Sequence, residues 1–345
     1  VHLINSGLGF PDLALGAFLN VLAQVLGVVI LSFLHLRNKH IWLISGFMFL
    51  IVFGLQIILP ILPIYLISTF LAGLASVAFY GTYNVSHFEL TPRNKTGSGA
   101  ALFFNMLIGV GIVSPVVAGF VSSLSVYYLL GLSVVFLLVA LYLLRYQEEV
   151  RVSFSVKKAL IEIKGVWFLI LLRGVHEAMG TVILLITLLL INNFFGFGLY
   201  GTVLAVLGIA LRFLIGKGSD RLQSKKVLIA PLAVLNGLVT VLYIFDFFQV
   251  NIVWWAVLNL VVGKIDGIFD QTSLAFIMDE TKERLKATFG RELVLNAGRL
   301  VGTAVVVVGF VFPLFLDYSI IILASTMFIY GFVVFRMKAT QKLAI

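Results

Sequence analysis

The sequence predicts an all-α, polytopic membrane protein. Of the 345 residues, 61% are hydrophobic and only 11% are charged, whereas an average soluble domain has about 25% charged residues. Apolar runs long enough to cross a bilayer follow one another from end to end. The segments between them alternate between basic and uncharged, as the loops of a multi-pass membrane protein do.

Eleven spans are expected, and each connection between them has a clear charge character. The expected spans are residues 13–34, 41–60, 62–86, 98–121, 126–145, 166–191, 198–216, 227–247, 252–277, 292–316 and 319–336. Lys and Arg gather in every second connection, and the others have none. The positive-inside rule therefore predicts a cell-membrane protein with a cytoplasmic C-terminus and an external N-terminus.

The net charge of +9 and the lack of cysteine exclude several other functions. Because the Lys and Arg residues lie in short loops, the charge predicts contact with membrane lipid, not with nucleic acid. Without cysteine there is no disulfide framework and no thiolate metal site. The five histidines are scattered, so we expect no metal, no cofactor and no catalytic residues.

One basic turn between two apolar runs carries a recognisable pattern. The segment Gly216-Lys-Gly-Ser-Asp220-Arg221-Leu-Gln-Ser-Lys225-Lys resembles the signature loop of the major facilitator superfamily, Gly-x3-Asp-Arg-x-Gly-Arg-Arg/Lys. Gly216, Asp220, Arg221 and Lys225 match, whereas Gln223 and Ser224 depart from it. A plain basic loop is the alternative. The resemblance implies a non-enzymatic transporter with two six-helix halves and a gating role for the four matching residues.

An internal repeat supports two related halves. Glu89, Arg93, Gly99, Asn105 and Gly111 recur at one offset (280 − 89 = 191) as the set Glu280, Arg284, Gly290, Asn296 and Gly302. We therefore expect an N-terminal half at 1–145, a cytoplasmic linker at 146–165 and a C-terminal half at 166–345. Eleven spans then mean that the first of twelve helices is largely missing, and the spans are numbered 2 to 12.

The linker and the loop after helix 2 each carry a weaker pattern. In residues 155–164, Val156, Leu160 and Ile163 share one face and lysines another, which fits a short helix on the inner membrane surface. An ordinary solvated linker fits as well. The loop at residues 35–39 keeps the basic part of the signature, but His35 stands where the aspartate would be.

Charged residues inside the spans are the main candidates for function. Only seven are found there, and each is costly in lipid, at ~2.5–3.5 kcal/mol or more near the centre. They are Arg173, Glu177, Arg212, Lys264, Asp266, Asp270 and Arg299. Five lie in helices 7 and 10, which line the central cavity in the family that the chain resembles. We expect Arg212 and Arg299 to extend their side chains to the inner surface.

Helices 7 and 10 each place their charges on one face. Arg173, His176 and Glu177 are three and four residues apart, so Arg173 can pair with Glu177. Asp266 and Asp270 are one turn apart and should share a proton unless a cation intervenes. Lys264 points elsewhere and could reach Glu177. The alternatives are a purely structural ion pair in helix 7 and a pair of Asp270 with Arg299.

Helices 4 and 5 supply neutral candidates. Tyr80, Tyr83 and Asn84, with Thr82 and Asn105, can line a cavity or merely bond neighbouring helices. Residues 109–119 in helix 5 look like a weakened Gly-Pro-x-x-Gly-Gly motif of antiporters, although small residues and proline are common in membrane helices.

These observations predict a monomeric secondary transporter that works by alternating access. Glu177 and Asp266 are the candidates for proton coupling, and Arg173 and Lys264 would tune them or bind an anionic group. Export of a small amphipathic compound is the first expectation. Proton-linked uptake of a small organic anion or sugar is the second, and a non-transporting receptor-like relative or a membrane-embedded enzyme is the alternative of another class.

Asp220→Asn tests the signature loop. We expect it to impair transport much more than folding, because contacts of such a loop form in only one state of the cycle. Flux in reconstituted vesicles, measured beside the melting temperature, checks this. Normal flux in correctly inserted protein would reduce the loop to a topological anchor.

Overall fold

The structure is a computed structural model of the whole chain. It describes the backbone except at residues 91–95, 145, 147–148, 220–225, 246, 248–250, 282 and 338–345. Inside helices, the side chains of residues 88–90, 96–109, 144, 208–219, 226–227, 264, 271, 275 and 278–280 are also left undescribed. The signature loop with Asp220, Arg221 and Lys225 therefore lies outside the described residues, as do the surroundings of Gly216 and the side chains of Arg212 and Lys264.

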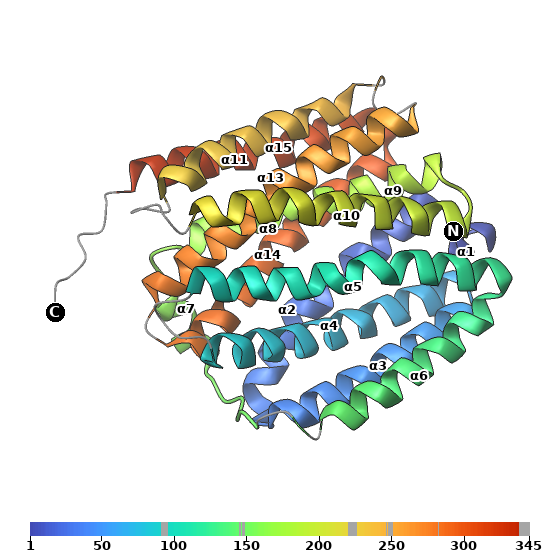
Figure 1. Ribbon diagram of the computed structural model, residues 1–345, viewed down its shortest axis with the longest axis horizontal. Helices are drawn as coiled ribbons and strands as arrows, with labels where there is room; N and C mark the ends of the chain where they lie inside the picture. The colour runs from blue at the N-terminus through green and yellow to red at the C-terminus, as the bar shows by residue number, and fades with distance from the viewer. Residues whose placement is uncertain are drawn as a thin grey trace.

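The described chain is almost entirely helical (Figure 1). Its α-helices are α1 (His2–Asn5), α2 (Phe10–Leu34), α3 (Asn38–Ile58), α4 (Leu62–Leu90), α5 (Thr96–Leu124), α6 (Val126–Leu144), α7 (Val156–Glu162), α8 (Trp167–Glu177), α9 (Met179–Leu190), α10 (Phe194–Ser219), α11 (Lys226–Val241), α13 (Ile252–Glu280), α14 (Arg284–Val311) and α15 (Leu316–Arg336). Short 3-10 turns follow α11 and precede α15.

The membrane-spanning helices fall where the sequence predicted them. Among the described residues, 8 helices are long and apolar enough to cross a bilayer, from Phe10–Leu34 to Pro313–Arg336. Three shorter apolar stretches, Val110–Leu124, Phe194–Leu207 and Leu228–Ile244, lie in the remaining expected spans. The chain is therefore an all-α, multi-pass membrane protein.

The predicted span 166–191 differs from the expectation, because it is divided into α8 and α9. The division lies at Ala178, directly after Glu177. The Ala178 N–H bonds to Val175 O, and the Thr181 N–H bonds to Ala178 O, so the turn is tightened to a 3-10 pattern. Such a turn inside a helix marks a joint between two helical pieces that can take different neighbours.

Two long helix pairs join the halves of the chain. α2 packs along α14, and α5 packs along α10, between the outer layers formed by α3 with α6 and by α11 with α15 (Figure 1). Small residues permit the second contact. A Cβ on Gly198 would lie 2.2 Å from the Pro115 carbonyl oxygen, and one on Gly119 would lie 2.6 Å from the Phe194 carbonyl oxygen. The small residues near Pro115 thus serve close helix packing.

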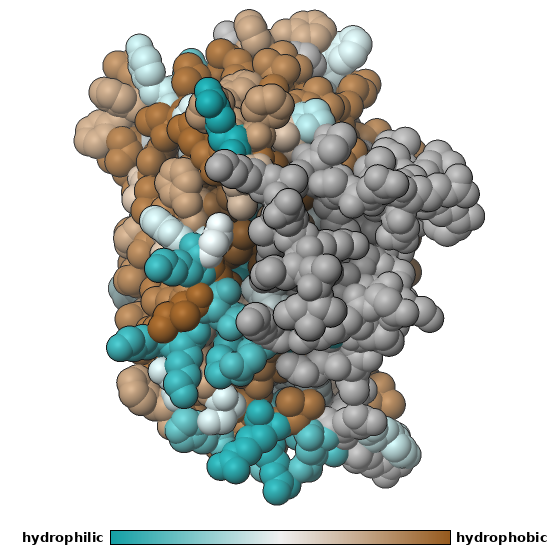
Figure 2. All heavy atoms as spheres, turned by 90° about the vertical axis from the view of Figure 1, so that its left-hand side faces the viewer, coloured by the Kyte–Doolittle hydropathy of each residue, from teal (hydrophilic) through white to brown (hydrophobic). Residues whose placement is uncertain are grey.

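The end of the molecule that carries α7, here called the α7 end, is polar. In Figure 2, which faces this end, hydrophilic side chains gather in the lower part of the view, while the part above them is largely hydrophobic. α7 coincides with the short helix predicted in the linker. Ala159 within it and Ile163 directly after it are buried, whereas Leu160, which was expected on the apolar face, is exposed. The apolar face of the linker helix thus packs on protein, in part against α14.

Glycines bring α8 and α14 into close contact. A Cβ on Gly174 would lie 2.1 Å from the Leu295 carbonyl oxygen, and one on Gly298 would lie 2.3 Å from the Leu171 carbonyl oxygen. These positions hold the helix backbones nearly in contact, which places the side chains next to Gly174 directly against α14.

Gly174→Ala should therefore lower the stability of the protein. The added methyl group must push α14 away, and overpacking of this kind costs about 1–3 kcal/mol. Gly180→Ala is the matched control, because nothing lies within 4 Å of a Cβ at Gly180. Melting temperatures of the two purified variants check this, and equal melting temperatures would contradict it.

Candidate functional site

A cavity of about 530 Å³ lies between the two halves of the chain. The wall formed by α2 and α4 is neutral and consists of Gln24, Ser76, Val77, Tyr80 and Asn84. The wall formed by α8, α13 and α14 is charged and consists of Arg173, Glu177, Asp270, Leu274, Arg291, Glu292 and Arg299. One side of the cavity thus offers neutral hydrogen-bonding groups with one aromatic ring and one valine, and the other offers ions.

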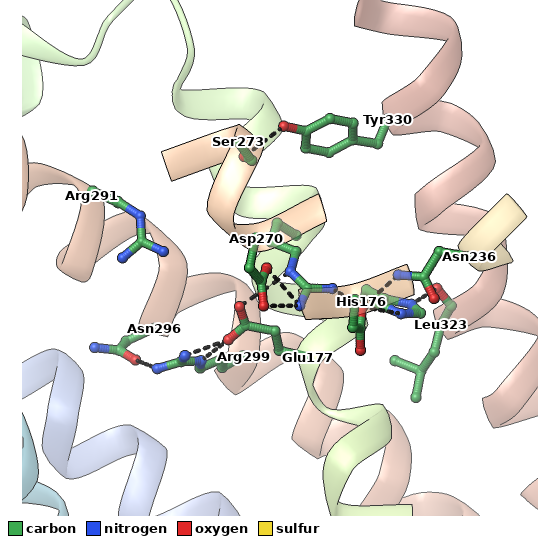
Figure 3. A network of polar contacts seen from close by, with 12 residues as sticks. His176, Glu177, Asn236, Asp270, Ser273, Arg291, Asn296, Arg299, Leu323 and Tyr330 are labelled. Atoms are coloured by element: carbon green, nitrogen blue, oxygen red, sulfur yellow. Dashed lines mark hydrogen bonds and ion pairs between the residues drawn. The ribbon is translucent and has the colours of Figure 1, made fainter. Parts of the chain in front are cut away.

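Arg173 is the centre of the charged wall (Figure 3). Its Nη1 donates to Asp266 Oδ1 at 2.8 Å, its Nη2 lies 2.8 Å from Asp270 Oδ1, and its Nε lies 3.2 Å from Glu177 Oε1. The guanidinium also lies 5.3 Å from the centre of the Phe269 ring. Only 7% of the Arg173 side chain is exposed, so these partners replace water as its solvation.

Glu177 connects Arg173 to a second arginine. Arg299 donates from Nε to Glu177 Oε2 at 2.5 Å, and its Nη1 donates to Asn296 Oδ1 at 2.8 Å. Glu177 therefore bridges α8 and α14. Because α8 ends at this residue, the bridge lies at the joint between α8 and α9.

Two further groups lie next to Asp266. Asn236 of α11 donates to Asp266 Oδ1 at 2.5 Å, and His176 Nε2 lies 3.8 Å from the same oxygen. The other ring nitrogen of His176 lies 3.2 Å from the Leu323 carbonyl oxygen, which can only accept, so Nδ1 carries the hydrogen. In the neutral ring, Nε2 then presents a lone pair towards Asp266, where a proton can be taken up.

The cavity has a separate ion pair next to α4. Arg291 Nη1 donates to Glu292 Oε1 at 2.8 Å, and Asn84 of α4 donates to the same oxygen over a long 3.4 Å. The contact between Asn84 and Glu292 crosses from one half of the chain to the other. It is weak at this length.

Most of the candidate residues that the sequence indicated are brought together here. Arg173, Glu177, Asp266, Asp270 and His176 form one connected group, and Tyr80 and Asn84 line the cavity beside it. The cation that sequence reasoning allowed between Asp266 and Asp270 is Arg173. Tyr83 instead stacks on Phe79, with ring centres 6.2 Å apart.

One alternative and one expectation from the sequence are wrong. Asp270 pairs with Arg173 and not with Arg299, and Arg299 binds Glu177 at the cavity wall and does not extend to the surface. The reason is the close approach of α8 and α14, which brings Arg299 to Glu177. The proposed partnership of Lys264 with Glu177 lies outside the described side chains.

Sequence reasoning missed several members of the site. Asn236 holds Asp266, and Arg291, Glu292 and Gln24 line the cavity. A polar side chain inside an apolar span was the available signal for Asn236 and Gln24. Arg291 and Glu292 could not be recognised as cavity residues, because they lie next to a basic loop in the sequence and charged residues are common in such loops.

The family is settled by a sequence match that spans most of the chain. Residues 3–303 match the Major Facilitator Superfamily. The chain belongs to this family. As the family and the fold imply, it is a membrane transport protein and not an enzyme.

The fold agrees with that of a solved member of the superfamily. The crystal structure of the human organic anion transporter MFSD10 (TETRAN) superposes with a TM-score of 0.64 at 10% sequence identity, covering 94% of this chain and 83% of that one. At this identity the likeness shows the fold alone. No curated protein matches the sequence.

Arg173→Met should destabilise the protein, and more so at high pH. It leaves three carboxylates without their common counter-ion, and breaking a buried ion pair costs about 3–5 kcal/mol. Protonation relieves the repulsion, so the melting temperature of the variant should rise as the pH falls from 7.5 towards 5.5.

Arg37→Met is the control for this experiment. Arg37 pairs with Glu149 at the surface, where 61% of the Arg37 side chain is exposed, and such pairs contribute about 0–1 kcal/mol. If both variants melted alike, or if acid did not help Arg173→Met, the carboxylates would not depend on Arg173.

Proposed function

We infer that this member of the Major Facilitator Superfamily couples the movement of a small molecule to protons by alternating access. The charge balance of the connected network supports this. Arg173 and Arg299 supply two positive charges, whereas Glu177, Asp266 and Asp270 supply three negative ones. With every carboxylate ionised, the network has a net charge of 2 − 3 = −1.

A single proton makes the network neutral. It can reside on a carboxyl group or on His176 Nε2, which faces Asp266 at 3.8 Å. An uncompensated charge is costly in a dry setting, so neutrality favours the closed intermediate that every transport cycle passes through. A site of this kind exchanges one proton per cycle, and Glu177 and Asp270 line the cavity from which that proton can leave.

The shape of the cavity favours an amphipathic substrate. Val77 and Tyr80 of the neutral wall, with Leu274 of the charged wall, can bind an apolar or aromatic body, while the carboxylates of the charged wall can bind a cationic group. Such a group would compete with the proton for the single excess negative charge. Proton-driven export of an amphipathic compound is therefore the function that we favour.

A second candidate is proton-linked uptake of a small organic anion or sugar. Arg173, Arg291 and Arg299 all line the cavity, and arginine binds carboxylates in a two-pronged geometry. The organic anion transporter with the same fold adds a weak analogy. Each of these arginines has a carboxylate partner, which an anionic substrate would have to displace, so we rank this function second.

The chain would act as a monomer in the cell membrane with its C-terminus in the cytoplasm. The basic and uncharged connections support this orientation. The halves at 1–145 and 166–345 would rock about the cavity, and the linker would face the cytoplasm. In this orientation the α7 end is the cytoplasmic end.

Flux into proteoliposomes tests transport itself. The complete protein is reconstituted with a proton gradient and offered fluorescent amphipathic cations, organic anions and sugars, after a ligand-stabilisation screen has narrowed each class. We expect a cationic dye to move up its own concentration gradient, in the direction opposite to the flow of protons. No flux for any compound that stabilises the protein would favour a receptor-like role.

Glu177→Gln and Asp266→Asn test the coupling. A neutral mimic cannot release a proton, so uphill, pH-driven transport should be lost while substrate exchange survives. A purely structural role predicts instead a lower melting temperature and the loss of both activities.

Asp317→Asn is the matched control, because Asp317 is exposed in the first turn of α15 and does not line the cavity. It should leave driven flux, exchange and melting unchanged. Unchanged uphill transport in both cavity variants would eliminate Glu177 and Asp266 as the coupling site and direct attention to His176 and Asp270.

A further inference from the structure

Residues 149–162, here called the strap, lie across both halves of the chain at the α7 end. The first part of the strap lies against the loop between α2 and α3. The Asn38 N–H donates to Val150 O at 3.0 Å, and the Val152 N–H donates to Leu36 O at 2.9 Å. Asn38 Oδ1 also accepts from the Val150 N–H at 3.1 Å. These bonds pair the strap with the loop in a short antiparallel β-bridge between Arg37 and Arg151.

The second part of the strap lies against α14. The Phe154 ring stacks on the Phe289 ring with centroids 4.1 Å apart and planes within 5°. Gly290 leaves room for the strap, because a Cβ there would lie 2.4 Å from the Ala159 carbonyl oxygen. The Glu162 carboxylate accepts from the Glu283 N–H at 3.0 Å, at the N-terminus of α14.

The Phe289 ring packs between the strap and α4. One side of its ring meets Phe154, and another meets α4, where a Cβ on Gly81 would lie 3.0 Å from the ring. Phe154 and Phe289 belong to one buried apolar cluster with Val77 and Val85 of α4. Because Val77 also lines the cavity, this cluster reaches from the strap to the cavity wall.

We propose that the strap is a latch that holds the α7 end closed, with Phe154 and Phe289 as its gate residues. The inference rests on the alternating access proposed above. The two attachments differ in kind. Backbone hydrogen bonds fix residues 150–152 to the α2–α3 loop. Against α14, the strap packs Ala159 on Gly290, has one exposed bond to the Glu283 N–H and stacks Phe154 on Phe289. A rigid-body rotation can separate this stack without leaving a buried polar group unpaired.

His35 fits this arrangement. It stands where the signature pattern has an aspartate, it adopts a left-handed backbone with φ 43° at the end of α2, and its Nδ1 lies 3.0 Å from the Ser153 hydroxyl. The loop therefore presents its backbone and His35 to the strap. The strap, in turn, reaches α14 of the other half.

Cysteine labelling tests the latch directly, since the chain has no cysteine of its own. Ser76→Cys places a thiol on the cavity wall, and a membrane-impermeant maleimide is applied from the side of the α7 end. Phe154→Ala should speed labelling by about tenfold, because an aromatic pair contributes about 0.5–1.5 kcal/mol beyond its buried area. Unchanged labelling in this variant would overturn the proposal.

Leu160→Ala is the control within the same strap, because Leu160 is 38% exposed and should leave the labelling rate as it is. If Phe154→Ala does not insert, Phe154→Leu keeps much of the bulk but loses the stack, and labelling should still rise about threefold. An unchanged rate in Phe154→Leu would equally overturn the latch.

Cross-linking provides the opposite test. Phe154→Cys and Phe289→Cys are joined by a short bifunctional maleimide, while a third cysteine, Tyr80→Cys, is reversibly protected. After deprotection, the maleimide applied from the α7 side should label Tyr80→Cys more slowly in the cross-linked protein than in the same variant without the cross-link. Faster or equal labelling would contradict the latch. These readouts need no substrate and no proton gradient, so a protein without coupled flux can still have the latch, and a coupled transporter can lack it.

Discussion

A guanidinium group buried among apolar helices must find its whole solvation in neighbouring side chains. Arg173 does so with Asp266, Asp270 and Glu177, which lie on α13 and on its own helix α8. Each of these carboxylates is costly in its turn. Glu177 therefore recruits Arg299 from α14, and Asp266 recruits Asn236 from α11. One buried charge thus fixes the mutual orientation of four helices. The polar groups favour this one arrangement of the helices, because another arrangement would leave a charge unpaired.

The location of these ion pairs is compatible with large movements. All of the strong pairs in the network join residues of the segment 166–345, whereas the polar contact seen across the cavity is the long bond from Asn84 to Glu292. Among the described side chains, rotation of one half against the other therefore breaks no buried ion pair. What it mainly separates there is apolar contact and close packing of small residues, whose loss leaves no unpaired charge. The charged wall can accordingly stay intact during the alternating access proposed above.

Sequence alone predicts much of this arrangement because lipid imposes simple constraints. The span positions follow from hydropathy, and the charges in helices 7 and 10 stand out because so few ions are tolerated there. The partners of those charges are less predictable. Arg299 was expected at the surface, since nothing in one sequence reveals that Gly174 and Gly298 bring α8 and α14 almost into backbone contact. Asn236 is one polar residue among several, and its choice of Asp266 depends on how the helices cross.

The joint at Ala178 shows how packing and chemistry meet. α8 is packed tightly on α14 through Gly174 and Gly298. α9 also contacts α14, but it has further neighbours, because Leu185 packs in a cluster with Leu13 and Tyr65 from the N-terminal half. A continuous helix would have to follow both sets of contacts at once. The tightened turn between them lets each piece keep its own neighbours. Glu177 is the last residue of α8 before this turn, so the carboxylate that links the two arginines lies where any displacement of α9 first reaches the charged network.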